Sequence, residues 1–192
     1  MKNKIKDTAC QLFQEKGFHN TSMREIAEEL QVSKAALYYH YSNKEELFIS
    51  IIDEAFQTMN SFFDKIPKDT SFWQLIHLWI QMMVKQRRES PGIRKLIFYL
   101  IMGRYKNQIN YDMRPHMEKG VESFRKLMDK AIENKEIRND LPLDFMLKYL
   151  FTTVQGMLNE MEERPLLKFD EMKDKELTEA LFVITKGALE YK

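Results

Sequence analysis

Residues 22–44 read SMREIAEELQVSKAALYYHYSNK, and this stretch decides the fold of the amino-terminal part of the chain. Ser22 and Glu25 have the spacing of a capping box, which predicts the start of a short helix. After a break in the apolar pattern, Ser33 is placed to cap another short helix that extends to about Tyr39. Two short helices joined by a tight turn are typical of a helix-turn-helix.

The apolar residues of this stretch have the spacing needed to hold the two helices together. The segment 33–39 would form a helix about 10 Å long, which suits a DNA major groove about 12 Å wide. Its exposed side would carry Ser33, Lys34, Ala35, Tyr38 and Tyr39 toward a partner. The expected core consists of Ile26, Ala27, Leu30, Val32, Ala36 and Leu37.

The composition of the whole chain favours an all-α fold. The 192 residues are 44% hydrophobic and 31% charged, and six glycines and five prolines leave little turn chemistry for β-hairpins. The single cysteine, Cys10, excludes an intramolecular disulfide and a cysteine-based zinc site. The longest apolar run, 96–102, is too short to span a bilayer, so we expect a cytoplasmic protein without membrane contact.

Caps and apolar periodicity predict about nine helices. The segment 72–84 has no charged residue, which indicates a central, buried helix. We expect residues 1–46 to form a DNA-binding domain and residues 47–192 to form a ligand-binding and dimerisation domain. The expected helices span residues 4–16, 22–30, 33–39, 44–66, 71–88, 90–104, 113–134, 142–163 and 174–191.

The amino-terminal sequence resembles the DNA-binding domain of TetR-family transcriptional regulators over about residues 5–48. Tyr41 departs from the phenylalanine that is more usual there, and the leader before the first helix is short. The resemblance implies a helical ligand domain, a homodimer and a double-stranded DNA operator as partner. The residues that carry the resemblance are Cys10, Leu12, Phe13, Gly17, Phe18, the segment 21–27, Val32, Ser33, Lys34, the segment 37–41 and the segment 44–47.

The resemblance also implies a set of DNA contacts. Ser22, Arg24 and Lys44 correspond to phosphate contacts at helix starts, where free N–H groups favour anions. Tyr38, Tyr39 and His40 correspond to mixed backbone and base contacts. The base-reading end of the recognition helix corresponds to Ser33, Lys34, Ala35 and Ala36, in which lysine suits guanine acceptors and alanine suits thymine methyl groups.

Each of these residues also has an ordinary structural interpretation. Ser22 and Ser33 are helix caps whether or not they contact DNA, His40 could be a structural histidine, and Lys34 or Lys44 could be solvated. Charge adds little, because residues 1–44 hold seven Lys and Arg against five Asp and Glu, a margin of +2. No single residue decides between the two interpretations, but the occurrence of all of them together at the spacing of the family favours DNA binding.

The carboxy-terminal part predicts a dimer and an effector site. Apolar residues on two faces of 143–161 and a stripe from Leu177 to Tyr191 favour a homodimer through the last two helices. Large, adaptable side chains, a few polar groups and the family resemblance together predict a site for a small apolar or aromatic effector. The candidate effector residues are Met59, Phe63, His77, Ile80, Phe98, Met102, Phe124, Met128, Tyr149, Thr152 and Gln155.

The function expected from these observations is ligand-responsive, sequence-specific regulation of transcription, most simply repression that the effector relieves. We expect no catalytic residue, cofactor or metal, because the sequence has no phosphate loop, no paired histidine motif and no clustered histidines. Three alternatives remain: a helical interaction module without specific DNA binding, an activator of the same family and, least favoured, a small helical enzyme.

Overall fold

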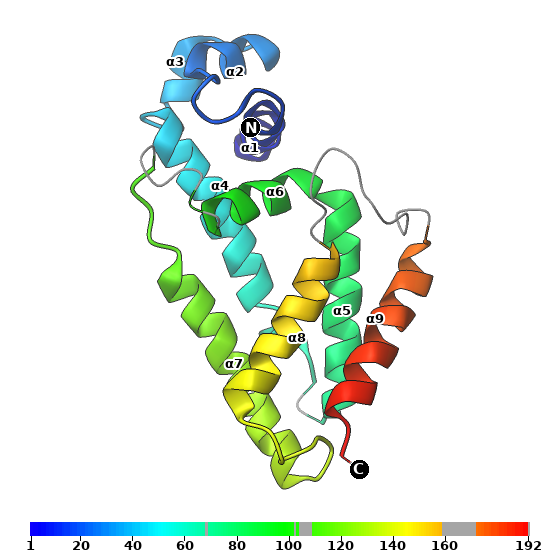
Figure 1. The fold of residues 1–192 in the computed structure, drawn as a ribbon. Helices are drawn as coiled ribbons and strands as arrows, with labels where there is room; N and C mark the ends of the chain where they lie inside the picture. The colour runs from blue at the N-terminus through cyan, green and yellow to red at the C-terminus, as the bar shows by residue number, and fades with distance from the viewer. Residues whose placement is uncertain (68, 102, 104–108, 159–171, 192) are drawn as a thin grey trace. The chain divides into compact units, whose positions relative to one another are not determined.

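The computed structural model describes residues 1–67, 69–101, 103, 109–158 and 172–191. Within these ranges the chain is helical, as Figure 1 shows, and an isolated bridge between Ile137 and Glu190 is the only β pairing. The predicted all-α fold class is confirmed. The elements are α1 (Lys2–Lys16), α2 (Met23–Glu29), α3 (Lys34–Tyr38), α4 (Lys44–Asn60), the 3-10 helix η1 (Phe63–Lys65), α5 (Phe72–Glu89), α6 (Pro91–Ile101), α7 (Arg114–Glu133), α8 (Leu143–Leu158) and α9 (Asp174–Leu189).

The predicted fourth helix extends further than the helix in the structure. The sequence predicted one helix over 44–66, but α4 ends at Asn60 and η1 follows it. The aromatic residues at 62 and 63 continue the apolar pattern of the helix. Periodicity alone therefore could not predict that the helix ends at residue 60. The predicted end of the eighth helix, at 163, lies outside the described residues, as do positions 102 and 104 of the sixth.

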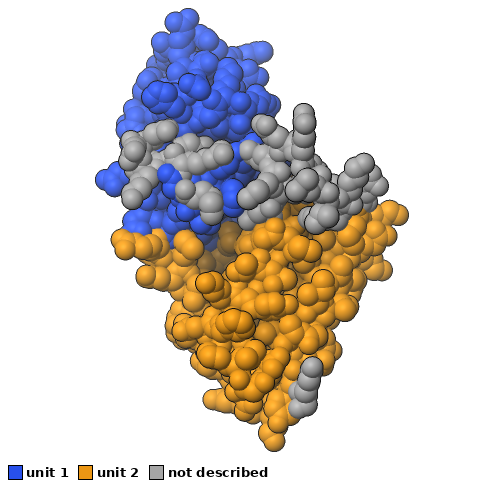
Figure 2. All heavy atoms as spheres, in the orientation of Figure 1, with its two compact units in different colours: residues 1–58, 90–113 blue, residues 59–89, 114–192 orange. Residues whose placement is uncertain are grey.

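The first compact unit consists of residues 1–58 and 90–113, shown in blue in Figure 2. Its core is built around the rings of Phe13, Phe18 and Phe48, whose centroids lie 5.1 to 5.6 Å apart. Ile26 of α2 and Leu37 of α3 are completely buried in the same cluster, so α1 and α4 support the helix-turn-helix.

Helix α6 belongs to this first unit and packs against α1. At the start of α6, Gly92 is buried directly against the side chain of Gln14. A Cβ atom at position 92 would lie only 1.1 Å from Gln14 Nε2, so the contact as it stands requires glycine.

The second compact unit consists of residues 59–89 and 114–192, shown in orange in Figure 2. Helix α5 contacts α7, α8 and α9, as expected for a central helix. Ile76 and Ile80 on α5 are completely buried, together with Met128, Met146 and Leu150 from the surrounding helices.

The compact units and the predicted domains follow different boundaries. The first unit includes most of α4 and all of α6, whereas the prediction placed everything after residue 46 in the second domain. Compactness does not say which residues serve DNA binding, so the functional boundary stays a prediction. In the part of the chain that the structure describes, no helix is long and apolar enough to cross a membrane.

Candidate nucleic-acid interface

The turn between α2 and α3 is fixed by backbone geometry and by caps. Gln31 has φ 56°, a left-handed conformation that turns the chain, and the next N–H, from Val32, donates to the carbonyl of Ala27 at 3.0 Å. Ser33 then begins α3 by accepting the backbone N–H of Ala36 at 3.1 Å. These bonds hold α3 at a fixed angle to α2.

Burial separates the two sides of α3. Leu37 is completely buried, whereas Tyr38 is 50% exposed and Tyr39 is 84% exposed. Lys34 and Ala35 are exposed too, and Lys34 makes no hydrogen bond or ion pair within the described residues. The side of α3 opposite its core therefore presents one free cation and two phenol groups to solvent.

His40 and Ala36 lie at the edge of this exposed surface, and both are half-buried. The His40 ring stands edge-on to the ring of Tyr39 with centroids 5.1 Å apart. The predicted base-reading residues of 33–39 are thus brought together on one surface, with His40 beside them.

Ser22 forms a complete capping box with Glu25 at the start of α2. Its hydroxyl accepts the backbone N–H of Glu25 at 3.2 Å, and the Glu25 carboxylate accepts the backbone N–H of Ser22 at 2.8 Å. Lys16 donates to the same carboxylate at 3.1 Å. The hydrogen bond from the Ser22 backbone, followed by those from Lys16 and the Ser22 hydroxyl, lowers the pKa of Glu25.

Arg24 lies on the exposed face of the first turn of α2. Its Nε donates to Glu28 at 2.6 Å, and this bond raises the pKa of the already strongly basic guanidinium. The side chain remains 68% exposed. Because the bond to Glu28 uses Nε, the two terminal nitrogens are available to a phosphate.

Lys44 lies at the start of α4, as the sequence predicted, and its side chain makes contacts within the protein that the sequence did not indicate. Its ammonium group donates to the backbone carbonyls of Phe18 at 2.6 Å, Thr21 at 2.7 Å and His19 at 3.2 Å. It also lies 4.4 Å from the centroid of the Phe18 ring. Burial lowers the pKa of Lys44, although Glu25 acts in the opposite direction. Because all three ammonium hydrogens have acceptors within the protein, Lys44 ties α4 to the loop between α1 and α2.

An exposed recognition helix on a rigid three-helix support defines the first unit as a helix-turn-helix DNA-binding module. Residues 5–51 match the family model described as bacterial regulatory proteins, tetR family. Residues 5–51 therefore form a helix-turn-helix DNA-binding domain of the TetR type, and over most of its length the chain is similar to an HTH-type transcriptional regulator.

Two curated relatives are similar to the chain over different lengths. YfiR of Bacillus subtilis, an HTH-type transcriptional regulator, is 26% identical over 88% of this chain and 81% of its own length. IcaR of Staphylococcus epidermidis, the negative transcriptional regulator of the biofilm operon icaADBC, is 45% identical over 29% of this chain and 30% of its own length. These are regulators of transcription, which decides against the enzyme alternative.

Solved structures match the fold over nearly the whole chain. A tetR-family regulatory protein from Rhodococcus RHA1 superposes with a TM-score of 0.77 at 13% identity, covering 100% of this chain and 97% of the other. The TetR-family regulator PfmR of Thermus thermophilus gives a TM-score of 0.75 at 20% identity, covering 95% and 97%. At these identities the likeness concerns the fold alone.

Some candidate effector residues meet in an aromatic cluster in the second unit. Phe124 lies at its centre, 4.8 Å from Phe63, 4.9 Å from Trp79 and 4.9 Å from Phe151, measured between ring centroids. All three contacts are edge-to-face, a favourable arrangement for aromatic rings. Ile80 and Met128 are completely buried in the same core, and Met59 and Tyr149 pack against it.

Other candidate effector residues lie elsewhere. His77 is paired on the surface with Glu179 at 2.9 Å, Thr152 is exposed, and Gln155 is half-buried. Phe98 belongs to the first unit, and Met102 lies outside the described residues. Spacing within a helix could not distinguish the residues of α5 and α8 that face the core from those that face solvent.

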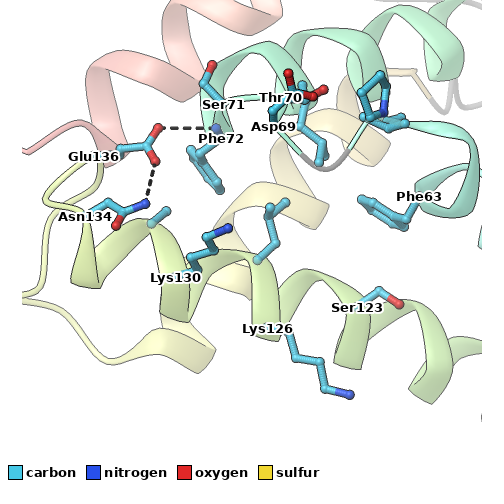
Figure 3. A pocket seen from close by; sticks show the side chains of 15 residues that line it. Phe63, Asp69, Thr70, Ser71, Phe72, Ser123, Lys126, Lys130, Asn134 and Glu136 are labelled. Atoms are coloured by element: carbon cyan, nitrogen blue, oxygen red, sulfur yellow. Dashed lines mark hydrogen bonds between the residues drawn. The ribbon is translucent and has the colours of Figure 1, made fainter.

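A pocket that sequence reasoning missed lies between the loop before α5 and the carboxy-terminal half of α7, as Figure 3 shows. Its volume is about 520 Å³, within the usual range for small-molecule sites. Only Phe63 among the predicted effector residues lines it. The pocket arises where two distant segments meet, and no motif in either segment indicates it.

Proposed function

We propose that the protein is a dimeric repressor that binds a near-palindromic operator and is released by a small effector with an apolar or aromatic part. It would act in the cytoplasm, where bacterial operator DNA is found. IcaR is described as a negative regulator, which supports repression as the direction of control.

The exposure of α3 is the observation that carries this proposal. A helix whose inner side is closed by Leu37 and whose outer side presents Lys34, Ala35 and Tyr39 has the dimensions and chemistry of a major-groove reader. We assign base contacts to Lys34, Ala35 and their neighbours on 33–39, including Ala36, with the Tyr38 and Tyr39 hydroxyls available to phosphates.

The remaining predicted contacts take two different roles in the proposal. Arg24 and the start of α2 at Ser22 would contact phosphate, and His40 would support Tyr39 from the side. Lys44 would act mainly by holding the loop 17–21 against α4, because its hydrogen bonds are already made. A phosphate that contacts Lys44 would have to compete with these three carbonyl oxygens for the hydrogens of the ammonium group.

Specific binding requires a dimer, because one recognition helix reads too few base pairs to select a site. Both α8 and α9 carry exposed stripes at helical spacing that suit such an interface. On α8 the stripe includes Phe145, Thr152 and Gly156, and on α9 it includes Val183, Ile184 and Gly187, with Tyr191 just beyond the end of the helix. Open space surrounds the Cα atoms of Gly156 and Gly187, so a partner helix could approach closely there. Thr152 therefore fits the dimer interface better than the effector site.

The aromatic cluster around Phe124 suits an effector that acts on α4. Phe63 joins this cluster and follows the end of α4 at Asn60 by three residues, so a ligand that displaces its ring would also move the end of α4. The effector would bind more tightly to a form whose recognition helices are misplaced for the operator, and would shift the population toward that form.

The experiment is an electrophoretic mobility assay with the DNA that flanks the gene for this protein. A complex with one site that weakens steeply with salt is expected. Lys34→Ala should change which bases are preferred, by about tenfold at the position it contacts, with normal unfolding behaviour. Equal, weak binding to all sequences would favour the interaction module instead, and ligand-strengthened binding with rising transcription would favour an activator.

A further inference from the structure

The pocket beside α7 has an apolar floor and a mixed polar rim. Phe63, Phe72, Leu75 and Leu127 form most of the floor, and all belong to the second unit. Because these side chains border the buried core while the pocket remains open to solvent, an apolar group that enters here would be removed from water without displacing the core.

Most of the polar groups on the rim already have partners. The Glu136 carboxylate accepts the backbone N–H of Phe72 at 3.2 Å and the side-chain amide of Asn134 at 3.4 Å. The Ser123 hydroxyl donates to the carbonyl of Lys119 at 3.0 Å. The Ser123 hydroxyl and the Glu136 carboxylate can still accept hydrogen bonds, but they have no proton left to donate to an anion.

The two lysines on the rim differ from each other. Lys126 pairs with Glu122 at 3.5 Å, and in Figure 3 its side chain points away from the pocket. Lys130 lies one turn further along α7 and extends toward Phe72, and its ammonium group has no hydrogen bond or ion pair within the described residues. The pocket therefore combines apolar side chains with the ammonium group of Lys130 and the carboxylate of Asp69, neither of which has a partner within the described residues.

We propose that this pocket binds an amphipathic monocarboxylate, whose apolar part covers Phe63 and Leu127 and whose carboxylate pairs with Lys130. Asp69, on the opposite side of the pocket, disfavours ligands with two or more negative charges. The volume of about 520 Å³ accommodates a chain or ring system of moderate size.

The regulatory consequence of this site rests on the proposed function. Phe63 is shared by the pocket and the aromatic cluster around Phe124, so a ligand in the pocket would contact the residue through which α4 is expected to respond. Binding itself does not depend on that function and is tested without DNA.

The test is isothermal titration calorimetry of the full chain with sodium hexanoate, octanoate and decanoate, and with octan-1-ol as the uncharged control. Octanoate should bind at least tenfold more tightly than octan-1-ol, because only the carboxylate pairs with Lys130. Lys130→Gln should abolish that difference and leave octan-1-ol binding unchanged. Lys126→Gln, the matched control on the same helix, should change octanoate affinity less than twofold.

The proposal is overturned if none of the three carboxylates binds, if octanoate and octan-1-ol bind equally, or if Lys126→Gln and Lys130→Gln have equal effects. A second arm adds octanoate to the complex of the protein with its operator DNA. Release by octanoate that is lost in Lys130→Gln supports the regulatory link, whereas binding of octanoate without release overturns that link and leaves the site. Absence of any operator complex counts against the proposed function alone.

Discussion

Lys34 and Lys44 occupy similar positions, since each is the first residue of a helix in the DNA-binding region, but they differ in their surroundings. Lys34 is exposed and unpaired within the described residues, whereas Lys44 donates three hydrogen bonds to the loop before α2. The sequence identified the positions of both lysines. It could not distinguish them, because the acceptors of Lys44 are backbone carbonyls more than twenty residues away.

We predict that Lys44→Met lowers the free energy of unfolding by about 1–2 kcal/mol, because carbonyl groups in a partly buried loop lose their donor. Lys34→Met is the control and should change stability by less than about 0.5 kcal/mol, as is usual for exposed sites. Urea unfolding of the full chain measures both. Equal stability of the two variants would mean that Lys44 has no structural role.

The capping box of α2 predicts a dependence of stability on pH. The folded chain holds the pKa of Glu25 below its ordinary value, through Ser22 first and Lys16 second. Since the unfolded chain binds this proton at higher pH, Glu25 contributes stability above its ordinary pKa and loses that contribution as the pH falls through the folded value.

Glu25→Gln should therefore be less stable than the natural chain at pH 7, and the difference should shrink as the pH falls below about 4. Glutamine still has a capping oxygen, so the comparison isolates the charge. Urea unfolding at several pH values is the measurement, with the exposed Glu29→Gln as control. A difference that is constant over this range would contradict the assigned cause.

At the scale of elements, helix starts could be predicted because they depend on local chemistry. The capping box at Ser22 and the cap at Ser33 lie where the sequence placed them. The packing of α6 against α1 could not be predicted, because nothing in the sequence around Gly92 indicates which distant helix it meets. The pocket beside α7 was missed for the same reason.

The approach of α6 to α1 at Gly92 predicts a coupling between two residues. Gly92→Ala should give no gain in stability in the natural chain, because the new Cβ atom must displace Gln14. In a Gln14→Ala background the same change should stabilise by about 0.5–1 kcal/mol, the usual advantage of alanine over glycine in a helix. Denaturant unfolding of the four chains gives the coupling energy. If Gly92→Ala has the same effect in both backgrounds, the two side chains do not interact.

At the scale of the whole molecule, the exposed stripes of α8 and α9 matter most for function. Val183 is 65% exposed and Ile184 is 49% exposed, on a helix whose opposite side is fully buried. Hydrophobic exposure of this kind on adjacent helices supports the proposed dimer interface. Periodicity predicted an interface stripe of Leu177, Leu181, Ile184, Ala188 and Tyr191. Leu177 and Leu181 are instead buried in the core of the second unit, so the exposed stripe of α9 could be recognised only from the structure.

We expect the pair Val183→Glu and Ile184→Glu to convert the dimer to a monomer, because four glutamates would face one another across a twofold interface. Light scattering after size exclusion measures the mass directly. Met117→Glu on α7, at a residue that is 40% exposed outside this surface, is the control and should remain dimeric. A dimeric mass for the double variant would place the interface elsewhere.

The most direct test of the central claim, that two α3 helices read one operator together, is the affinity for operator DNA of altered spacing. Half-sites for paired recognition helices lie about one helical turn, or 34–36 Å, apart. Inserting about half a turn of DNA, roughly 5 base pairs, between them moves one half-site to the opposite face of the duplex. In fluorescence anisotropy at fixed salt, our account predicts that this insertion weakens binding to the level of nonspecific DNA. Unchanged affinity after the insertion would contradict it.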